Sequence, residues 1–402
     1  MTDQNSPIVL AFSGGLDTSF CIPWLKETYQ RPVVTVTVNT GGIDADAAQQ
    51  LEDRALALGA LEHRLIEARP EFFDSVLKFL VMGNVRRGQL YPLCVGSERA
   101  VQAKHLAELA TALGADTVAH GCTAAGNDQV RFEIVLKTLA PTLQILAPVR
   151  DHSWARPAQV AFLEERHLPV PSKGSAYSIN RGLWGVTIGG TETLDSRASI
   201  PETAWVLSAG ALDSTQPFRE IEVEFERGIA VAVDAERLDP VALIEKLEKI
   251  GAEYGIGRGI HLGDTIIGTK GRVAFEAPAA DILLTAHREL EKLTLTATQA
   301  RIKELVSLSY GDFIHEGKQL DPVCRDIEAL LASSQARVTG KVLLTLRPGS
   351  LFVVGVTSPH SLMAASRGRY GEAAGEWTSA DALGFSKILA LPGMLHTRAG
   401  GK

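Results

Sequence analysis

The chain has 402 residues, of which 45% are hydrophobic and 22% charged, a balance typical of a globular protein with two or three domains at ~100–200 residues each. The formal net charge is −7, and Arg86–Arg87 is the only adjacent pair of Lys or Arg side chains. Charge and composition therefore weigh against a nucleic-acid-binding surface.

Residues 1–150 alternate between strand and helix patterns. Apolar or β-branched runs, such as PIVLAF and PVVTVTV, predict strands over 7–12, 32–38, 116–120 and 143–149. Helices are predicted over 17–29, 44–58, 97–113 and 129–139, with Ser97 as the N-cap of the third. This alternation predicts a doubly wound parallel sheet, whose ligands bind in the loops at the carboxyl ends of its strands.

The pattern changes after the proline-containing stretch 168–172. Short alternating runs over 218–233 predict an antiparallel hairpin around Arg227–Gly228. Helices are expected over 240–250 and 278–293, and strands over 341–346 and 351–356. We predict a nucleotide-binding domain over 1–168, an α+β domain over 169–365, and a Gly/Ala-rich C-terminal segment over 366–402 with a short apolar run, GFSKILAL.

The four cysteines contain no CxxC pair and no zinc-finger spacing, so we expect reduced thiols and no protein-held metal cluster; they are Cys21, Cys94, Cys122 and Cys324. The N-terminus, MTDQNSP, is polar and lacks the features of a signal or transit peptide. No apolar run reaches the ~18 residues needed to span a bilayer. We therefore expect a cytoplasmic protein without membrane contact.

The loop between the first strand and the first helix combines two glycines with the hydroxyls of Ser13, Thr18 and Ser19. Glycines let backbone amides approach an anion, and the helix start adds a positive dipole. The loop is neither a GxxxxGK[ST] P-loop nor a GxGxxG motif. The alternative is a Gly-Gly turn in which Asp17 only caps the helix. The stretch SGGLDTS resembles the pyrophosphate-binding loop of ATP pyrophosphatases, which implies cleavage of ATP between its α and β phosphates.

A second loop, AHGCTAAGNDQVRFE over 119–133, also joins a strand to a helix. By itself it is equally explained as a capped helix with an Asp128–Arg131 pair at i, i+3. The string resembles the argininosuccinate synthase family. Further matches to that family are AFSGGLDTS over 11–19, Tyr177-Ser178-Ile179, Gly255-Ile256-Gly257-Arg258 and Glu276-Ala277-Pro278.

The resemblance implies a reaction that needs no protein nucleophile. The ureido oxygen of citrulline attacks the α-phosphorus of Mg-ATP to give citrullyl-AMP and pyrophosphate, and the aspartate amine then displaces AMP. Catalysis is then mostly positioning and charge stabilisation. The resemblance also implies that 169–365 is a synthetase domain binding citrulline and aspartate, and that 366–402 is an arm used in homotetramer assembly.

The resemblance also implies roles for individual residues. ATP would be held by Ala11, Phe12, Ser13, Gly14, Gly15, Leu16, Asp17, Thr18, Ser19, Val38 and Gly121. Aspartate would be bound by Thr123, Asn127 and Asp128. Citrulline would be bound by Tyr91, Asn127, Arg131 and Ser178, in a pocket that also takes in Ser97, Thr187, Asp264 and Phe275. The catalytic set would be Asp17, Asn127, Asp128 and Arg131, with Asp17 orienting Mg²⁺.

Several positions depart from the family pattern. The family usually has Ser at Gly96 and Asn at Gly182. It often has Ser at Thr187, Glu at Gly263, Tyr at Phe275 and Lys at Ala125. Ser97 and Asp264 are neighbours that could substitute for two of these. Two interpretations stay open: citrulline is the acceptor and neighbouring residues compensate, or the acceptor is a related ureido or amidic compound.

Two further hypotheses belong to other classes of protein. A tRNA thiolase shares the first loop but would need a cysteine pair, for which Cys94 and Cys122 are the candidates, and it leaves GNDQVRFE unexplained. A non-catalytic ATP-binding protein would bind ATP without releasing pyrophosphate.

Overall fold

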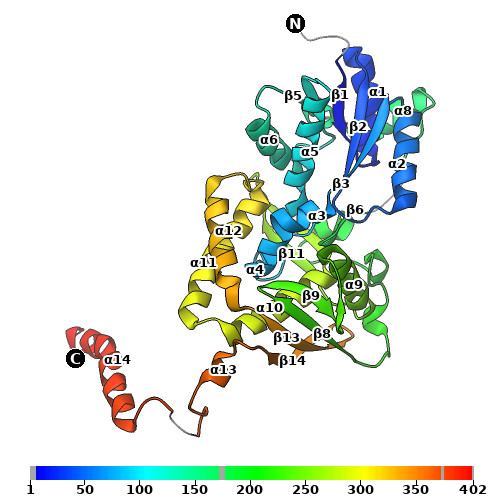
Figure 1. The fold of residues 1–402 in the computed structure, drawn as a ribbon. Coiled ribbons are helices and arrows are strands. Elements are labelled where there is room, and N and C mark those ends of the chain that lie inside the picture. The colour runs from blue at the N-terminus through cyan, green and yellow to red at the C-terminus, as the bar shows by residue number, and fades with distance from the viewer. Residues whose placement is uncertain (1–5, 172–176, 373–374, 401–402) are drawn as a thin grey trace.

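The computed structural model describes residues 6–171, 177–372 and 375–400 (Figure 1). The N-terminal part is built on a five-stranded parallel sheet of order β3-β2-β1-β4-β5. Its strands are β1 (Ile8–Ala11), β2 (Val33–Asn39), β3 (Glu62–Glu67), β4 (Thr117–Ala119) and β5 (Gln144–Leu146). The predicted doubly wound parallel sheet is therefore confirmed.

Helices cover both faces of this sheet because successive side chains of a strand point to opposite sides. Ile8 and Leu10 pack with α1 (Leu16–Tyr29), α2 (Ala45–Ala57) and α8 (Arg156–Glu165). Val9 packs with α5 (Arg99–Ala112) and α6 (Asp128–Leu139) on the other face. The winding direction reverses at β1, between β2 and β4. The loops after β1 and β4 therefore open side by side, where doubly wound folds bind ligands.

Some local predictions for this part were wrong or incomplete. Ser97 does not cap a helix, because residues Gly96–Glu98 form a 3₁₀ turn and α5 begins only at Arg99. The strand expected over 143–149 ends at Leu146, and Pro148 starts the short helix α7 (Pro148–Asp151). The sequence pattern did not predict β3 or the helical stretch α3 (Arg69–Phe72), η1 (Phe73–Leu77, a π-helical turn) and α4 (Lys78–Met82).

Two antiparallel sheets form the second part. One has the order β11-β12-β7-β6, from β6 (Ser178–Gly182), β7 (Gly185–Gly189), β11 (Arg258–Asp264) and β12 (Lys270–Glu276). The other has the order β10-β9-β8-β13-β14, from β8 (Arg219–Glu226), β9 (Ile229–Val233), β10 (Glu236–Arg237), β13 (Gly340–Arg347) and β14 (Ser350–Thr357). The β8–β9 hairpin turns at Arg227–Gly228, as predicted.

Helices α9 (Pro240–Glu253) and α10 (Pro278–Thr294) confirm two further predictions, whereas α11 (Ala297–Glu316) and α12 (Pro322–Ser334) were missed. Short 3₁₀ turns lie at Thr191–Leu194, Glu202–Ala204, Ala211–Asp213 and Gln335–Arg337. One apolar core runs from Val9 in the first sheet to Leu344 in β13, so the two parts pack as one body. The domain limits proposed at 168 and 365 stay a prediction.

The two parts also meet backbone to backbone. The amide of Leu183, in the β6–β7 turn, donates a hydrogen bond of 2.9 Å to the carbonyl of Thr40, just after β2. Gly41 allows this approach: its φ is +122°, and a Cβ there would lie 2.1 Å from the Leu183 nitrogen. Only glycine is compatible with that geometry.

The C-terminal segment ends in a long helix that lies apart from the rest of the molecule (Figure 1, red). After the short α13 (Leu362–Ala365), α14 (Ser379–Ala399) begins with a capping box between Thr378 and Asp381. Its apolar side chains are exposed, among them Leu383, Phe385, Ile388, Leu389 and Leu395. Of the helices in the described ranges, none combines the length and apolarity that a membrane crossing requires.

Candidate active site

The loop between β1 and α1 has the geometry of an anion cradle. Gly14 has a φ of +72°, and the Ser13 hydroxyl lies 3.2 Å from the Thr18 hydroxyl, which holds the loop in a tight turn. Gly15 is the N-cap of α1, so within the described chain no side chain caps its first amides. The buried Ser19 hydroxyl also has no hydrogen-bond partner there. Uncapped amides and a hydroxyl at a helix N-terminus form a site for phosphate oxygens.

The cradle and the second predicted loop are in direct contact. A Cβ on Gly121 would lie 2.8 Å from the Thr18 methyl carbon and 3.1 Å from the Thr18 nitrogen. Asp17 does not cap α1; its Oδ1 accepts a hydrogen bond of 2.9 Å from the Gln159 amide on α8. The structure thus disfavours the simple capping role for Asp17 and brings both loops to one edge of the sheet.

Asp128, the first residue of α6, lies between two guanidinium groups. Its Oδ1 is 2.7 Å from Arg131 Nη1, and its Oδ2 is 2.9 Å from Arg99 Nε. Burial opposes the charged form, but the guanidinium groups of Arg99 and Arg131 outweigh it and lower the pKa of Asp128 to about 2. Arg131 in turn donates from Nε to the carbonyl of His315 at 2.8 Å, which ties α6 to the end of α11.

Sequence reasoning missed Glu98 and Arg99. Arg99 Nη1 donates to Glu98 Oε1 at 2.8 Å and to Gln102 Oε1 at 2.9 Å. Burial raises the pKa of Glu98 to about 7, and its Oε2 has no hydrogen-bond partner in the described chain. Ser97, predicted to bind substrate, is buried beside it, with a hydroxyl that likewise finds no partner there. No motif or periodicity in the stretch GSERA marks these residues.

Tyr91 lies in an aromatic wall of the site. Its hydroxyl donates to the Cys94 carbonyl at 2.6 Å, and its ring stacks on His261 at 5.3 Å between centroids. The Phe275 ring lies 5.2 Å from Tyr91, and Thr187 is the cross-strand neighbour of Phe275. The structure therefore places three of the predicted substrate residues, Tyr91, Thr187 and Phe275, in one region.

Asn127 joins the two parts of the molecule. Its Oδ1 accepts a hydrogen bond of 2.9 Å from the Ile266 amide in the β11–β12 turn. Although Asn127 occupies the N-cap position of α6, its side chain does not cap the helix, so the capped-helix interpretation was wrong for this residue. The predicted Asp128–Arg131 pair at i, i+3 is present. Thr123 is exposed in the preceding loop.

Two predicted residues lie outside this cluster. Asp264, at the end of β11, is exposed and pairs with Lys270 across the hairpin at 2.5 Å. Successive strand residues face opposite ways, so Asp264 does not replace a side chain at Gly263, where a Cβ would lie 2.4 Å from His261 Nε2. Ser178 is exposed at the start of β6. Their assignment to substrate stays a prediction, and for Asp264 the geometry counts against it.

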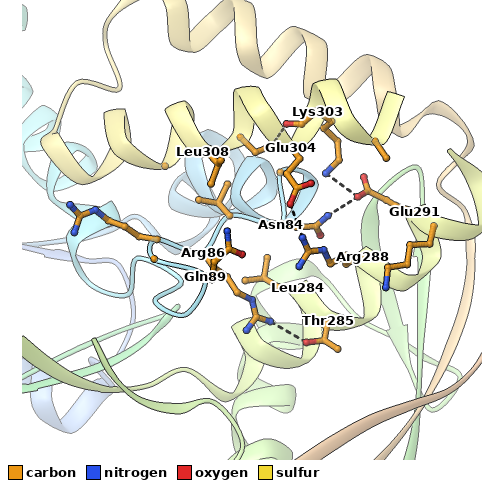
Figure 2. Close-up of a pocket in the computed structure, with 18 of the residues that line it drawn as sticks. Asn84, Arg86, Gln89, Leu284, Thr285, Arg288, Glu291, Lys303, Glu304 and Leu308 are labelled. Carbon is orange, nitrogen blue, oxygen red and sulfur yellow. Dashed lines mark hydrogen bonds and ion pairs between the residues drawn. The ribbon is translucent and has the colours of Figure 1, made fainter. Parts of the chain in front are cut away.

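A cavity of about 810 Å³ lies between residues 83–89 and the helices α10 and α11 (Figure 2). A buried polar network lines it: Glu291 is 2.9 Å from Lys303 Nζ and accepts from the Asn84 amide at 2.6 Å. This cavity lacks the cradle and the Asp128 cluster, so its volume alone does not make it the active site. Arg87 borders both regions, since it lines the cavity and lies 3.5 Å from His261.

Comparison with known proteins agrees with this geometry. The family models "Arginosuccinate synthase N-terminal HUP domain" and "Arginosuccinate synthase C-terminal domain" match residues 7–169 and 177–396. A protein from Xylella fastidiosa named argininosuccinate synthase is 41% identical over 400 residues, 98% of each chain. Proteins of the same name from Methanocaldococcus jannaschii and Dictyoglomus turgidum are 39% identical (88% of this chain, 89% of the relative) and 37% identical (99% of each). With both halves and both loops matched, the chain belongs to the argininosuccinate synthase family.

Proposed function

We propose that this protein is an ATP-dependent, AMP-forming C–N ligase that joins citrulline to aspartate to make argininosuccinate, in arginine biosynthesis. The observation that carries the proposal is the meeting of the anion cradle after β1 with the Asp128 cluster after β4 at one edge of the sheet. Family membership over nearly the full chain supports it.

The chemistry requires positioning more than protein-derived nucleophiles. The ureido oxygen of citrulline attacks the α-phosphorus of ATP, and pyrophosphate leaves. The aspartate amine then attacks the ureido carbon, AMP leaves, and the amine loses its proton. The cradle amides and hydroxyls of Ser13–Ser19 would stabilise the departing pyrophosphate. With its pKa lowered to about 2, Asp128 stays ionised and acts as a fixed negative charge rather than a proton acceptor.

We further propose that Mg²⁺ enters with ATP and is held mainly by its phosphates. Asp17, in the first turn of α1 beside the cradle, is the protein carboxylate positioned to orient the ion, and Gln159 fixes that carboxylate. Among the residues that the structure describes, no three His, Cys, Asp or Glu side chains gather as ligands. The chain itself therefore offers few ligands, and the nucleotide would supply the others.

The departures from the family pattern favour compensation over a different acceptor. At three glycines that replace polar residues of the family, the space a side chain would need is taken by a polar side chain of this chain. The nearest distances from a Cβ are 3.1 Å at Gly96 to Arg131 Nη2, 2.3 Å at Gly182 to Glu98 Oε2 and 2.4 Å at Gly263 to His261 Nε2. A different ureido or amidic acceptor is the second candidate, because these polar groups need not hold the head group of citrulline in the family's way.

The thiolase hypothesis finds no support in the cysteines. Cys94 is fully buried, and burial raises its pKa; burial raises the pKa of Cys122 to about 12. Both remain protonated thiols at neutral pH, whereas thiolate is the reactive form. We propose instead a cytoplasmic enzyme that acts only on small molecules.

We also propose that the protein assembles as a homotetramer through residues 366–402. A helix that leaves Phe385, Ile388 and Leu389 exposed within one chain needs an apolar partner. A second copy of this chain supplies that partner in the assembly that the family resemblance implies.

The function is tested by measuring pyrophosphate release from Mg-ATP with aspartate and citrulline, and by identifying the product by mass. Argininosuccinate from the wild type, with a loss of at least about 100-fold in Asp128→Ala, is expected if this charge orients both guanidinium groups. Asp74→Ala, at an exposed position on η1, is the matched control and should keep wild-type turnover. Folded, ATP-binding protein that makes no product with citrulline would overturn the proposed substrate.

A further inference from the structure

A line of alternating charges crosses the site and reaches beyond the residues assigned so far. Glu98 Oε1 is 2.8 Å from Arg99 Nη1, Arg99 Nε is 2.9 Å from Asp128 Oδ2, and Asp128 Oδ1 is 2.7 Å from Arg131 Nη1. The line joins the start of α5 to the start of α6. Asp128 is therefore held from two sides, and Arg99 links it to Glu98.

Glu98 is the buried end of this line. Only 2% of the residue is exposed, and Oε2 has no hydrogen-bond partner in the parts of the chain that the structure describes. Holding a carboxylate in this position is costly unless its charge is paired, and Arg99 is the cation that pairs it. A buried carboxylate maintained at such a cost beside a site is better explained by function than by stability.

The second part of the molecule closes over this carboxylate. Gly182, at the end of β6, lies so close that a Cβ on it would be 2.3 Å from Glu98 Oε2. A side chain there would have to push Glu98, and with it Arg99, away from its position. The β6–β7 turn therefore lies directly against the carboxylate that pairs with Arg99, and Arg99 is the residue that pairs with Asp128.

We propose that Glu98 is a positioning residue that acts through Arg99 to fix Asp128 for the aspartate substrate, and that Gly182 sets its position. The inference rests on the proposed function, because it assigns Asp128 to aspartate. Glu98 would not touch substrate. Its removal would free Arg99 to move, so that the aspartate site is disordered while the ATP cradle of Ser13–Ser19, whose hydrogen bonds do not involve Glu98 or Arg99, is left intact.

Protonation of Glu98 gives a readout that a purely structural role would not. The charged groups facing it are Arg99 and Asp128, with the Cys94 thiol nearby; Thr40 and Gln102 are its polar neighbours, and Gly182 adds no charge. Burial raises its pKa to about 7. Between pH 6 and 8 the wild type should gain kcat/KM for aspartate relative to Glu98→Gln, because ionised Glu98 holds Arg99 and the neutral amide does not titrate.

The experiment compares steady-state KM for aspartate and for ATP in wild type, Glu98→Ala, Glu98→Gln and Gly182→Ala. We expect KM for aspartate to rise on the order of 10-fold in Glu98→Ala and in Gly182→Ala, which corresponds to the loss of one hydrogen bond to a charged group. The KM for ATP should stay within about 2-fold of the wild-type value. The controls are Glu108→Ala, on the exposed side of α5, and Gly189→Ala, on the same hairpin as Gly182, where a Cβ would meet no atom within 4 Å.

The outcomes separate the two proposals. Argininosuccinate formed by the wild type, with KM for aspartate in Glu98→Ala and Gly182→Ala equal to the controls, would overturn the positioning role alone. The positioning role also fails if the KM values for ATP and aspartate rise together, or if the pH dependence of Glu98→Gln matches that of the wild type. Absence of argininosuccinate from the wild type would overturn the proposed function and this inference together.

Discussion

Glu276, the last residue of β12, anchors a loop through a fully buried carboxylate. It accepts hydrogen bonds from the amides of Val206 (2.6 Å), Leu207 (3.0 Å) and Ser208 (3.0 Å), and from the Ser208 hydroxyl (2.5 Å). Arg258 then donates to that hydroxyl at 2.7 Å. This arrangement accounts for two of the motifs matched in the sequence, because Gly255–Arg258 and Glu276–Pro278 each contribute one of these anchoring side chains.

Glu276→Gln preserves the shape but exchanges one acceptor oxygen for a donor. Whichever oxygen is replaced, at least one buried amide or hydroxyl donor faces the new NH₂ group. An unpaired buried donor costs about 1–3 kcal/mol, and hydrogen bonds to a charged acceptor contribute about 1.5–3 kcal/mol each. We therefore expect Glu276→Gln to lower the free energy of unfolding by about 2–4 kcal/mol, and Glu276→Ala by more.

The assay is equilibrium unfolding in urea, followed by tryptophan fluorescence, with midpoints compared at equal protein concentration. Glu226→Gln is the matched control, since Glu226 is an exposed strand residue paired with Arg237, and surface changes usually stay within about 0.5 kcal/mol. If the free energy of unfolding of Glu276→Gln lies within about 0.5 kcal/mol of the wild-type value, the charged carboxylate does not stabilise the loop and the prediction is refuted.

Three other perturbations have expected outcomes. Because the pKa of Glu98 is raised, its carboxyl group binds a proton more tightly in the folded than in the unfolded state. The free energy of unfolding of the wild type, measured in urea, should therefore fall relative to that of Glu98→Gln as pH rises from about 4.5 through 7, by up to about 3 kcal/mol. Parallel pH profiles for the two proteins would contradict this. Gly121→Ala should raise the dissociation constant for ATP, measured by calorimetry, because the added Cβ would lie only 2.8 Å from the Thr18 methyl carbon and displace the cradle. Unchanged affinity would show that Thr18 can move aside without affecting ATP binding. A chain ending at residue 372 should remain folded but contain fewer subunits per particle, as measured by size-exclusion chromatography with light scattering. An unchanged number of subunits would exclude α14 from assembly.

The sequence was most informative where the signal is local. The cradle could be predicted because glycines, hydroxyls and a helix start follow one another within Ser13–Ser19. The β8–β9 hairpin could be predicted because alternating residues flank Arg227–Gly228. By contrast, β3 was missed because the stretch EHRLIE, at the sheet edge, is only partly buried and largely polar.

Long-range partners could not be predicted. Arg99 meets Asp128 across 29 residues, and His315 meets Arg131 across 184, through elements whose packing is set by the whole core. Ser97 was predicted to cap a helix because Ser is a good capping residue. It lies instead inside the 3₁₀ turn Gly96–Glu98, and α5 begins only at Arg99. Adjacent Glu and Arg residues are common on protein surfaces, so nothing local distinguishes Glu98 as buried.

The glycine junction at Gly41 has a consequence for how this enzyme can diverge. Because Thr40 and Leu183 meet through main-chain atoms, this contact between the nucleotide sheet and the β6–β7 turn does not depend on which side chains those two residues carry. Side chains around the junction can therefore be exchanged without breaking this hydrogen bond, provided that glycine is kept at position 41.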